Sequence, residues 1–171
     1  MKLKQTILLI ITLLTFSLKG IAMSLALQSS AFLTNTPIPK QYTCHGEDHS
    51  PDLSWHGAPT GTQSYVLIVD DPDAPGGTWV HWLLFNIPAT VNHLDKATQL
   101  PAGAISGKNS WGTAGYRGPC PPSGTHHYRF TLYALDTRLT VNSSVNKQDI
   151  INAMQNHILE RAELIGLYAS N

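Results

Sequence analysis

Three apolar runs along the chain predict buried β-strands. Residues 64–70 (SYVLIVD) and 79–87 (WVHWLLFNI) are almost continuously apolar, which is typical of strands buried on both faces. The segment between them holds two prolines and two glycines that cannot continue either strand, so we expect an antiparallel pair joined by a rigid loop. Residues 126–135 alternate instead, and this third strand should place His126 and Tyr128 on its core face.

Nearer the C-terminus the apolar positions change to the spacing of an amphipathic helix. Asn146 can cap a helix with Asp149 at its third position, and apolar residues follow at helical spacing as far as Ile165. We expect this helix to pack on the sheet. His157 falls within it, and is there more typical of a structural or surface residue than of a ligand.

A stretch rich in glycine and proline, residues 101–124, shows no usable periodicity. It predicts a long ordered loop that packs by its own side chains. Loops of this kind often carry function.

Composition narrows the class of protein. The 171 residues suffice for one well-packed domain, and no repeat or linker divides them. Only 13% of the residues are charged, with 11 basic and 11 acidic, so no basic patch supports nucleic-acid binding. The apolar fraction of 42% excludes a disordered chain, and the glycines and prolines between short apolar runs favour a turn-rich fold over a helix bundle.

The first residues have the pattern of a secretory signal peptide. Lys2 and Lys4 precede residues 6–18, an almost unbroken apolar run that is too short to span a bilayer comfortably. We predict that residues 1–22 form the signal peptide. An uncleaved anchor is the alternative, because Lys19 interrupts the usual passage from the apolar run to the cleavage site.

Small residues at the required positions place the cleavage after Ala22 or after Ala26. Residues 27–171 would then form a single, mildly acidic domain, because the leader carries basic residues and no acidic ones. We expect a periplasmic or secreted protein. No basic amphipathic helix or lipid-anchor motif is apparent in the sequence, so we expect no stable membrane insertion after cleavage.

Two cysteines, Cys44 and Cys120, would meet oxidising conditions in an exported protein. They can form one intramolecular disulfide or remain as two buried thiols. A metal site built on them is disfavoured, because no second cysteine lies near either one.

Polar side chains stand at the ends of the predicted strands. His81 alternates with Leu83 and Phe85, and His126 alternates with Tyr128, so both imidazoles should point to the core side close to the loops. The loop after the first strand adds Asp71 and Asp73, and the proline-rich residues 118–122 add a stiff wall. If these loops meet at one edge of the sheet, they enclose a small concave site.

Three chemistries fit that set of residues. In an anion site, histidines and loop N–H groups would donate to phosphate oxygens while an aspartate holds one imidazole by accepting its other N–H. For a zinc site, the sequence lacks closely spaced ligands such as H-E-x-x-H. For an enzyme with a nucleophilic serine, it lacks a G-x-S-x-G turn. The anion site explains the most residues with the fewest further requirements.

These residues stand in two long motifs. The first is DPDAP (residues 71–75) followed by His81-Trp82, and the second is GYRGPCPP (residues 115–122) followed by GTHHYRF (residues 124–130). In both motifs, and over residues 27–168 as a whole, the chain resembles the phosphatidylethanolamine-binding protein family, in particular the bacterial branch often described as Raf kinase inhibitor-like.

The resemblance implies a mainly β fold, with a large antiparallel sheet packed on a smaller one and a helix near the C-terminus. It also implies an end pocket that accepts phosphate, the phosphorylethanolamine head group or similar anions. The matching ligand-binding positions are Asp71, Asp73, His81, Gly118, Pro119, His126 and Tyr128. Two positions depart from the usual pattern, since His127 replaces a basic residue and His45 an acidic one.

We therefore expect an exported, non-enzymatic protein that binds a small anionic or phosphorylated ligand and needs no cofactor or metal. The family also includes inhibitors of kinases and of a serine carboxypeptidase. A second hypothesis is accordingly an inhibitor or signalling modulator that acts through its surface on a protease or a host protein. A third is a metal-dependent hydrolase.

Overall fold

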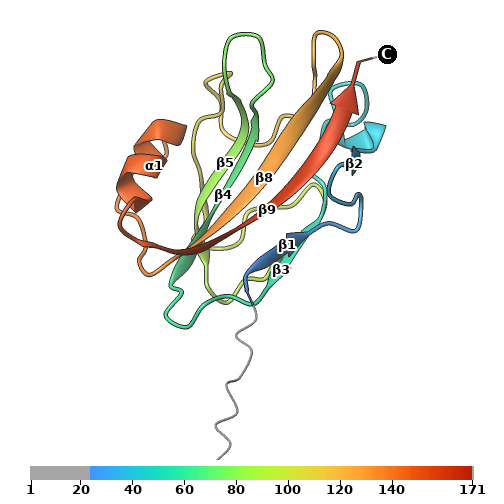
Figure 1. The fold of residues 1–171 in the computed structure, drawn as a ribbon. Helices are drawn as coiled ribbons and strands as arrows, with labels where there is room; N and C mark the ends of the chain where they lie inside the picture. Colours follow the sequence, from blue (N-terminus) through green and yellow to red (C-terminus); the bar gives the residue numbers. More distant parts are fainter. Residues whose placement is uncertain (1–23, 171) are drawn as a thin grey trace, which may run out of the picture.

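Two β-sheets make up most of the described part of the chain (Figure 1). The computed structural model describes residues 24–170, so the predicted signal peptide lies outside the described residues. Within them, the larger sheet has the strand order β2-β9-β8-β4-β5-β7 and the smaller one β1-β3-β6. The strands are β1 (Ala26–Gln28), β2 (Thr36–Pro37), β3 (Leu53–His56), β4 (Ser64–Asp71), β5 (Trp79–Pro88), β6 (His93–Leu94), β7 (Ile105–Ser106), β8 (Thr125–Leu135) and β9 (Ile158–Ala169).

The prediction of a large antiparallel sheet packed on a smaller one is confirmed. Strands β4 and β5 pair antiparallel as expected, and β8 pairs with β4 on the other side. The β2–β9 pair is the exception, because these two strands run parallel. The two helical segments within residues 24–170 are a short 3-10 helix, η1 (Lys40–Tyr42), and the α-helix α1 (Lys147–Met154).

Two apolar clusters lie on opposite faces of the large sheet. The main one fills the space between the sheets, where Leu67 and Phe130 meet Leu53 and Trp55 of the smaller sheet. The second lies under α1 and includes Ile68 of β4. Strand β4 is buried along its whole length because it contributes to both clusters, which explains its nearly unbroken apolar run.

The C-terminal helix is present but shorter than the sequence predicts. It begins after Asn146, whose side chain accepts the backbone N–H groups of Gln148 and Asp149 in a capping box, and it ends at Met154. The prediction that helix continues to Ile165 is wrong, because the chain turns and enters β9.

These residues form a strand rather than a helix because β8 would otherwise have an unpaired edge. Strand β9 pairs with β8 along nearly its full length, and this ladder outweighs the helical spacing of its apolar residues. His157 lies in the turn between α1 and β9, where its Nδ1 is 2.8 Å from Asp136 Oδ1. Within residues 24–170, no helix has the length and apolar character needed to cross a membrane.

Candidate functional site

Two loops meet at one end of the large sheet and enclose a small cavity. One loop connects β4 to β5 and the other leads into β8, and both stand at the upper end of the sheet in Figure 1. The cavity has a volume of about 270 Å³. Its lining residues are Asp71, Ala74, Pro75, Gly76, Trp79, His81, Trp111, Cys120 and Pro122. A space of this size suits a ligand as small as a phosphate with a short substituent.

Asp71 and His126 form a buried pair at this end of the sheet. The Nδ1 atom of His126 lies 2.7 Å from Asp71 Oδ2, and both side chains are less than a tenth exposed. The other carboxylate oxygen of Asp71 accepts the backbone N–H of Asp73 at 2.9 Å. Because both of its oxygens are engaged, Asp71 is placed to orient His126 rather than to contact an anion.

His81 reaches the cavity through a bulge in β5. A register shift leaves it without a partner on β4, and its ring packs edge-on against Tyr128 with the centroids 5.2 Å apart. Leu83 and Phe85 belong to the other cluster, under α1. The expected alternation of His81 with these two residues is therefore wrong, although His81 is buried on the core side as expected.

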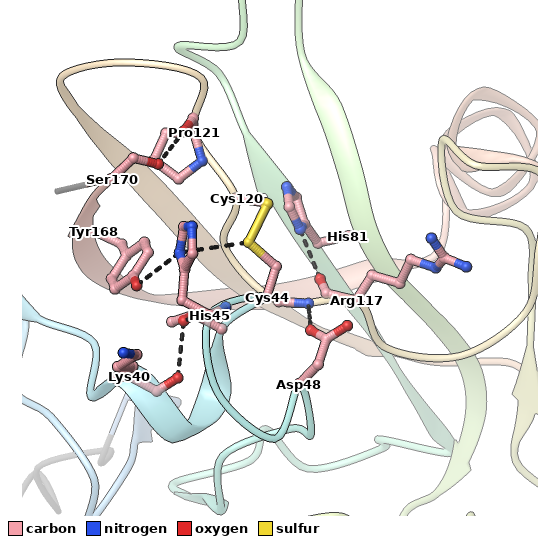
Figure 2. Close-up of a disulfide and its surroundings, with 12 residues drawn as sticks. Lys40, Cys44, His45, Asp48, His81, Arg117, Cys120, Pro121, Tyr168 and Ser170 are labelled. Carbon is pink, nitrogen blue, oxygen red and sulfur yellow. Dashed lines mark hydrogen bonds between the residues drawn. A yellow bond between two sulfur atoms is a disulfide. The ribbon is translucent and has the colours of Figure 1, made fainter.

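His81 has one ring nitrogen engaged within the protein. The Nδ1 atom of His81 donates to the carbonyl oxygen of Arg117 at 2.6 Å, as Figure 2 shows, which leaves Nε2 for the cavity. Burial lowers the pKa of His81, while the carbonyl of Arg117 and the negative charge of Asp71 oppose that lowering. The imidazole is therefore neutral near pH 7, with Nε2 as an acceptor that becomes a donor on protonation.

The hydroxyl of Tyr128 is an unusual buried group. Within residues 24–170, only Tyr128 Oη and Trp55 Nε1 are buried side-chain polar atoms that lack a hydrogen-bond partner. Burial raises the pKa of Tyr128 well above its usual value, and the charge of Asp71 raises it further. The hydroxyl lies beside Asp71 and Cys120, which both line the cavity, but Tyr128 itself is fully buried and is not among the lining residues. It is therefore a neutral donor next to the cavity wall.

Gly118 and Pro119 support the cavity wall from behind rather than lining it. The backbone N–H of Gly118 donates to Asp48 Oδ1 at 2.7 Å, and the carbonyl of Pro119 accepts the N–H of Cys44 at 3.1 Å. A Cβ atom on Gly118 would lie 2.3 Å from the carbonyl oxygen of Tyr42, so only glycine fits there. These contacts fix the wall to the loop that follows η1.

A disulfide joins the same two segments. Cys44, in the loop after η1, is bonded to Cys120 on the cavity wall, and the two Cα atoms lie 5.5 Å apart (Figure 2). Of the two alternatives that the sequence leaves open, the structure contains the bonded one. The bond ties together residues that are 76 positions apart in the chain.

Asp73 lies away from the cavity. Its carboxylate accepts the backbone N–H of His127 and contacts His127 Nδ1, each at 2.8 Å. Both side chains are about half exposed, and Asp73 is not among the lining residues. These hydrogen bonds lower the pKa of Asp73. His127, which departs from the family pattern, thus pairs with Asp73 on the outer side.

Two lining residues, Trp79 and Trp111, were not predicted from the sequence. Their rings meet edge-to-face with centroids 5.4 Å apart, and Trp111 also packs against His81. The guanidinium of Arg117 lies over Trp111, 5.3 Å from its centroid. The available signal in the sequence was a tryptophan within the glycine- and proline-rich stretch of residues 101–124, because long ordered loops often carry function.

The site contains hydrogen-bond donors for an anion, and the number of these donors depends on the protonation of the histidines. His81 lines the cavity, whereas His126 is not among the lining residues and is linked to the cavity through its partner Asp71, which is. The Nδ1 atoms of both rings are engaged by acceptors, so an Nε2 atom can donate only from a protonated ring. Among residues 24–170 there is no group of three or more His, Cys, Asp or Glu side chains that could hold a metal ion.

Comparison with known proteins matches this chain to one family. The family model described as "Phosphatidylethanolamine-binding protein" matches residues 28–169. A UPF0098 protein of Methanothermobacter thermautotrophicus is 51% identical over 146 residues, which cover 83% of this chain and 97% of that protein.

Two crystal structures are similar as well. A phosphatidylethanolamine-binding protein homologue from Chlamydia trachomatis has a TM-score of 0.83 at 40% identity, covering 86% of this chain and 99% of its own. YbcL of E. coli, described as a member of the mammalian PEBP family, has a TM-score of 0.82 at 35% identity, covering 87% of this chain and 100% of its own.

Proposed function

The chain belongs to the phosphatidylethanolamine-binding protein family, and from that premise we propose that its end cavity binds a small phosphate-bearing ligand without turning it over. The observation that carries the proposal is the buried, unpartnered hydroxyl of Tyr128 beside the cavity. A buried polar group without a partner is costly, and a small shift of the cavity wall would let an oxygen of a bound anion satisfy it. His81 and His126 then supply the charge.

Protonation should strengthen binding. A neutral imidazole whose Nδ1–H is already engaged presents a lone pair to the ligand, whereas a protonated one presents an N–H. Because burial lowers the pKa of His81 below 6.5 in the free protein, we expect affinity to keep rising as the pH falls through 6. A bound anion favours the charged ring, so binding should take up protons.

Export remains part of the proposal. Leu25 is buried in the main cluster and Ala26 pairs with His56 of β3, so cleavage after Ala26 would remove two residues of the fold. Cleavage after Ala22 would leave both in place. We therefore favour Ala22 for a periplasmic or secreted protein.

The test is calorimetric titration at pH 7.5, 6.5 and 5.5 with inorganic phosphate, phosphorylethanolamine and sulfate. Sulfate keeps its charge over this range, so it reports protonation of the protein alone. We expect the affinity for sulfate to rise as the pH falls. Phosphate and phosphorylethanolamine lose negative charge over the same range, so their affinity should rise less. In His126→Gln the affinity should drop by about tenfold or more at pH 5.5, because a hydrogen bond to a charged donor contributes about 1.5–3 kcal/mol.

His127→Gln is the matched control, because residue 127 is adjacent in sequence and faces the outer side. It should bind like the wild type. Equal affinity of the wild type and His126→Gln at every pH would refute the anion site. Phosphorylethanolamine recovered unchanged, by phosphorus NMR, supports binding without turnover, and its hydrolysis would contradict it.

A further inference from the structure

The two sulfurs of the disulfide have different surroundings. Cys120 is exposed and lines the cavity, so a small thiol can approach it from that side. Cys44 is half-buried in the loop after η1 and has an imidazole beside it. The rate of thiol–disulfide exchange depends on which sulfur is attacked and which one leaves. The difference between the two surroundings therefore favours attack at one of the two sulfurs.

The imidazole belongs to His45. Its Nδ1 lies 3.6 Å from Cys44 Sγ and 3.0 Å from the hydroxyl of Tyr168, and Figure 2 shows it between the two. With a proton on Nδ1, His45 can donate to a sulfur that carries negative charge. An N–H donor of this kind stabilises a thiolate and therefore makes Cys44 the better leaving group.

A shallow hollow lies on the outer side of His45. It has a volume of about 220 Å³ and is lined by Lys40, His45, Tyr168 and Ala169. Lys40 adds positive charge to this hollow. The hydroxyl of Tyr168 holds the imidazole ring in place, and as a hydroxyl it can either donate to Nδ1 or accept from it.

We propose that the Cys44–Cys120 disulfide is a thiol–disulfide exchange site that is attacked at Cys120 and releases Cys44. The co-reactant is a thiolate of low molecular mass. Its sulfur forms a bond to Cys120 Sγ, the bond between the two cysteines breaks, and its electron pair leaves on Cys44 Sγ beside the Nδ1–H of His45. A second thiolate then attacks the mixed disulfide, so that the external thiol is oxidised and both cysteines are reduced.

The intermediate carries a consequence for the cavity, and that consequence rests on the proposed function. A thiol bonded to Cys120 would occupy the wall of the space assigned to the phosphate-bearing ligand. The modified protein should therefore bind phosphate more weakly than the unmodified protein. The direction of exchange stands independently of any ligand.

The experiment that tests the direction is trapping. The oxidised protein with its disulfide intact is treated briefly with glutathione, quenched with N-ethylmaleimide, and the single adducts are mapped by mass spectrometry. We expect glutathione on Cys120 and maleimide on Cys44. Glutathione on Cys44, or an even distribution between the two, would overturn the proposal.

A second measurement tests His45 itself. His45→Gln should slow reduction by about three- to tenfold, because the leaving sulfur loses its donor. The loss should be the same for glutathione, which is anionic, and for 2-mercaptoethanol, which is neutral as a thiol. Lys40→Gln is the matched control, since it removes charge from the same hollow without removing the contact to Cys44. A loss seen only with glutathione, and shared by Lys40→Gln, would show simple charge attraction and contradict the leaving-group role.

Titration of the trapped glutathione adduct with phosphate then separates the two proposals. Weaker binding than in the unmodified protein supports a blocked cavity, and unchanged binding rejects it. No binding by the unmodified protein at any pH would instead refute the proposed function, while the mapped direction of exchange would stand.

Discussion

Two aspartate–histidine pairs are formed by residues that are close together in the sequence, but the two pairs differ in their exposure to solvent. Asp71–His126 and Asp73–His127 have nearly equal nitrogen–oxygen distances, 2.7 and 2.8 Å. The first pair is less than a tenth exposed and its Asp71 lines the cavity, whereas the second is about half exposed on the outer side. Equal geometry therefore does not mean equal energy, because solvent screens the outer pair and not the inner one.

The largest expected difference between the pairs is in stability. His126→Ala would leave the charge of Asp71 buried with only one donor, the N–H of Asp73, and should lower the free energy of unfolding by about 3–5 kcal/mol. His127→Ala should cost less than about 1 kcal/mol. Urea denaturation at pH 7 compares the two variants. Equal losses would show that burial does not separate the pairs.

A smaller effect is expected from pH on the cavity side. Burial lowers the pKa of His81 in the folded state, so the unfolded chain binds the proton more readily once the pH falls below about 6.5. The contribution of His81 to stability should therefore be complete above that pH and decrease as the pH falls. His81→Gln cannot titrate and should show a shallower decrease between pH 7 and 5 in urea denaturation. An unchanged slope in this variant would contradict the assignment.

The same decrease should be partly reversed by ligand. Sulfate that binds the protonated cavity stabilises only the folded state, so it should raise the urea midpoint more at pH 5.5 than at pH 7.5. His126→Gln should lose most of this gain and His127→Gln should keep it. A gain that is equal in the three proteins would indicate a general salt effect rather than a site beside the inner pair.

The smallest effect belongs to the outer pair. Hydrogen bonds from His127 lower the pKa of Asp73, so its folded-state carboxylate contributes stability above pH 3.8 that is lost as the pH falls through the lowered value. Asp73→Asn should be slightly less stable than the wild type at pH 6 and equal to it at the acid end. High salt should reduce the difference at pH 6. A difference that is independent of salt and pH would mean that the pair is not acting through charge.

The sequence predicts those strands in which the burial of the side chains follows a regular pattern along the strand. Strand β4 is continuously apolar because both of its faces are covered, and the first half of β8, from Thr125 to Phe130, alternates because only one of its faces is covered. Strand β9 was missed because residues 158–165 satisfy a helical period, and only the presence of β8 beside them decides for a strand. That information is tertiary.

Within the candidate site the same distinction applies. Asp71 and His126 each stand in a recognisable motif, so the sequence identifies both as site candidates. The separation of Asp73 from the cavity could not be predicted, because Asp73 stands in a loop, where strand alternation does not apply. The bulge at His81 depends on the register between two strands. Trp111 reaches the cavity only through the path of the long loop that carries it.

The parallel pairing of β2 with β9 has a consequence for the order in which the domain can fold. Thr36 is paired with Gly166, and β9 lies between β2 and β8 inside the large sheet (Figure 1). During synthesis from the N-terminus, the residues of β2 are therefore made long before those of β9, the strand with which they pair. Contacts between such distant positions form slowly, so the main core should close only after the last strand has been synthesised.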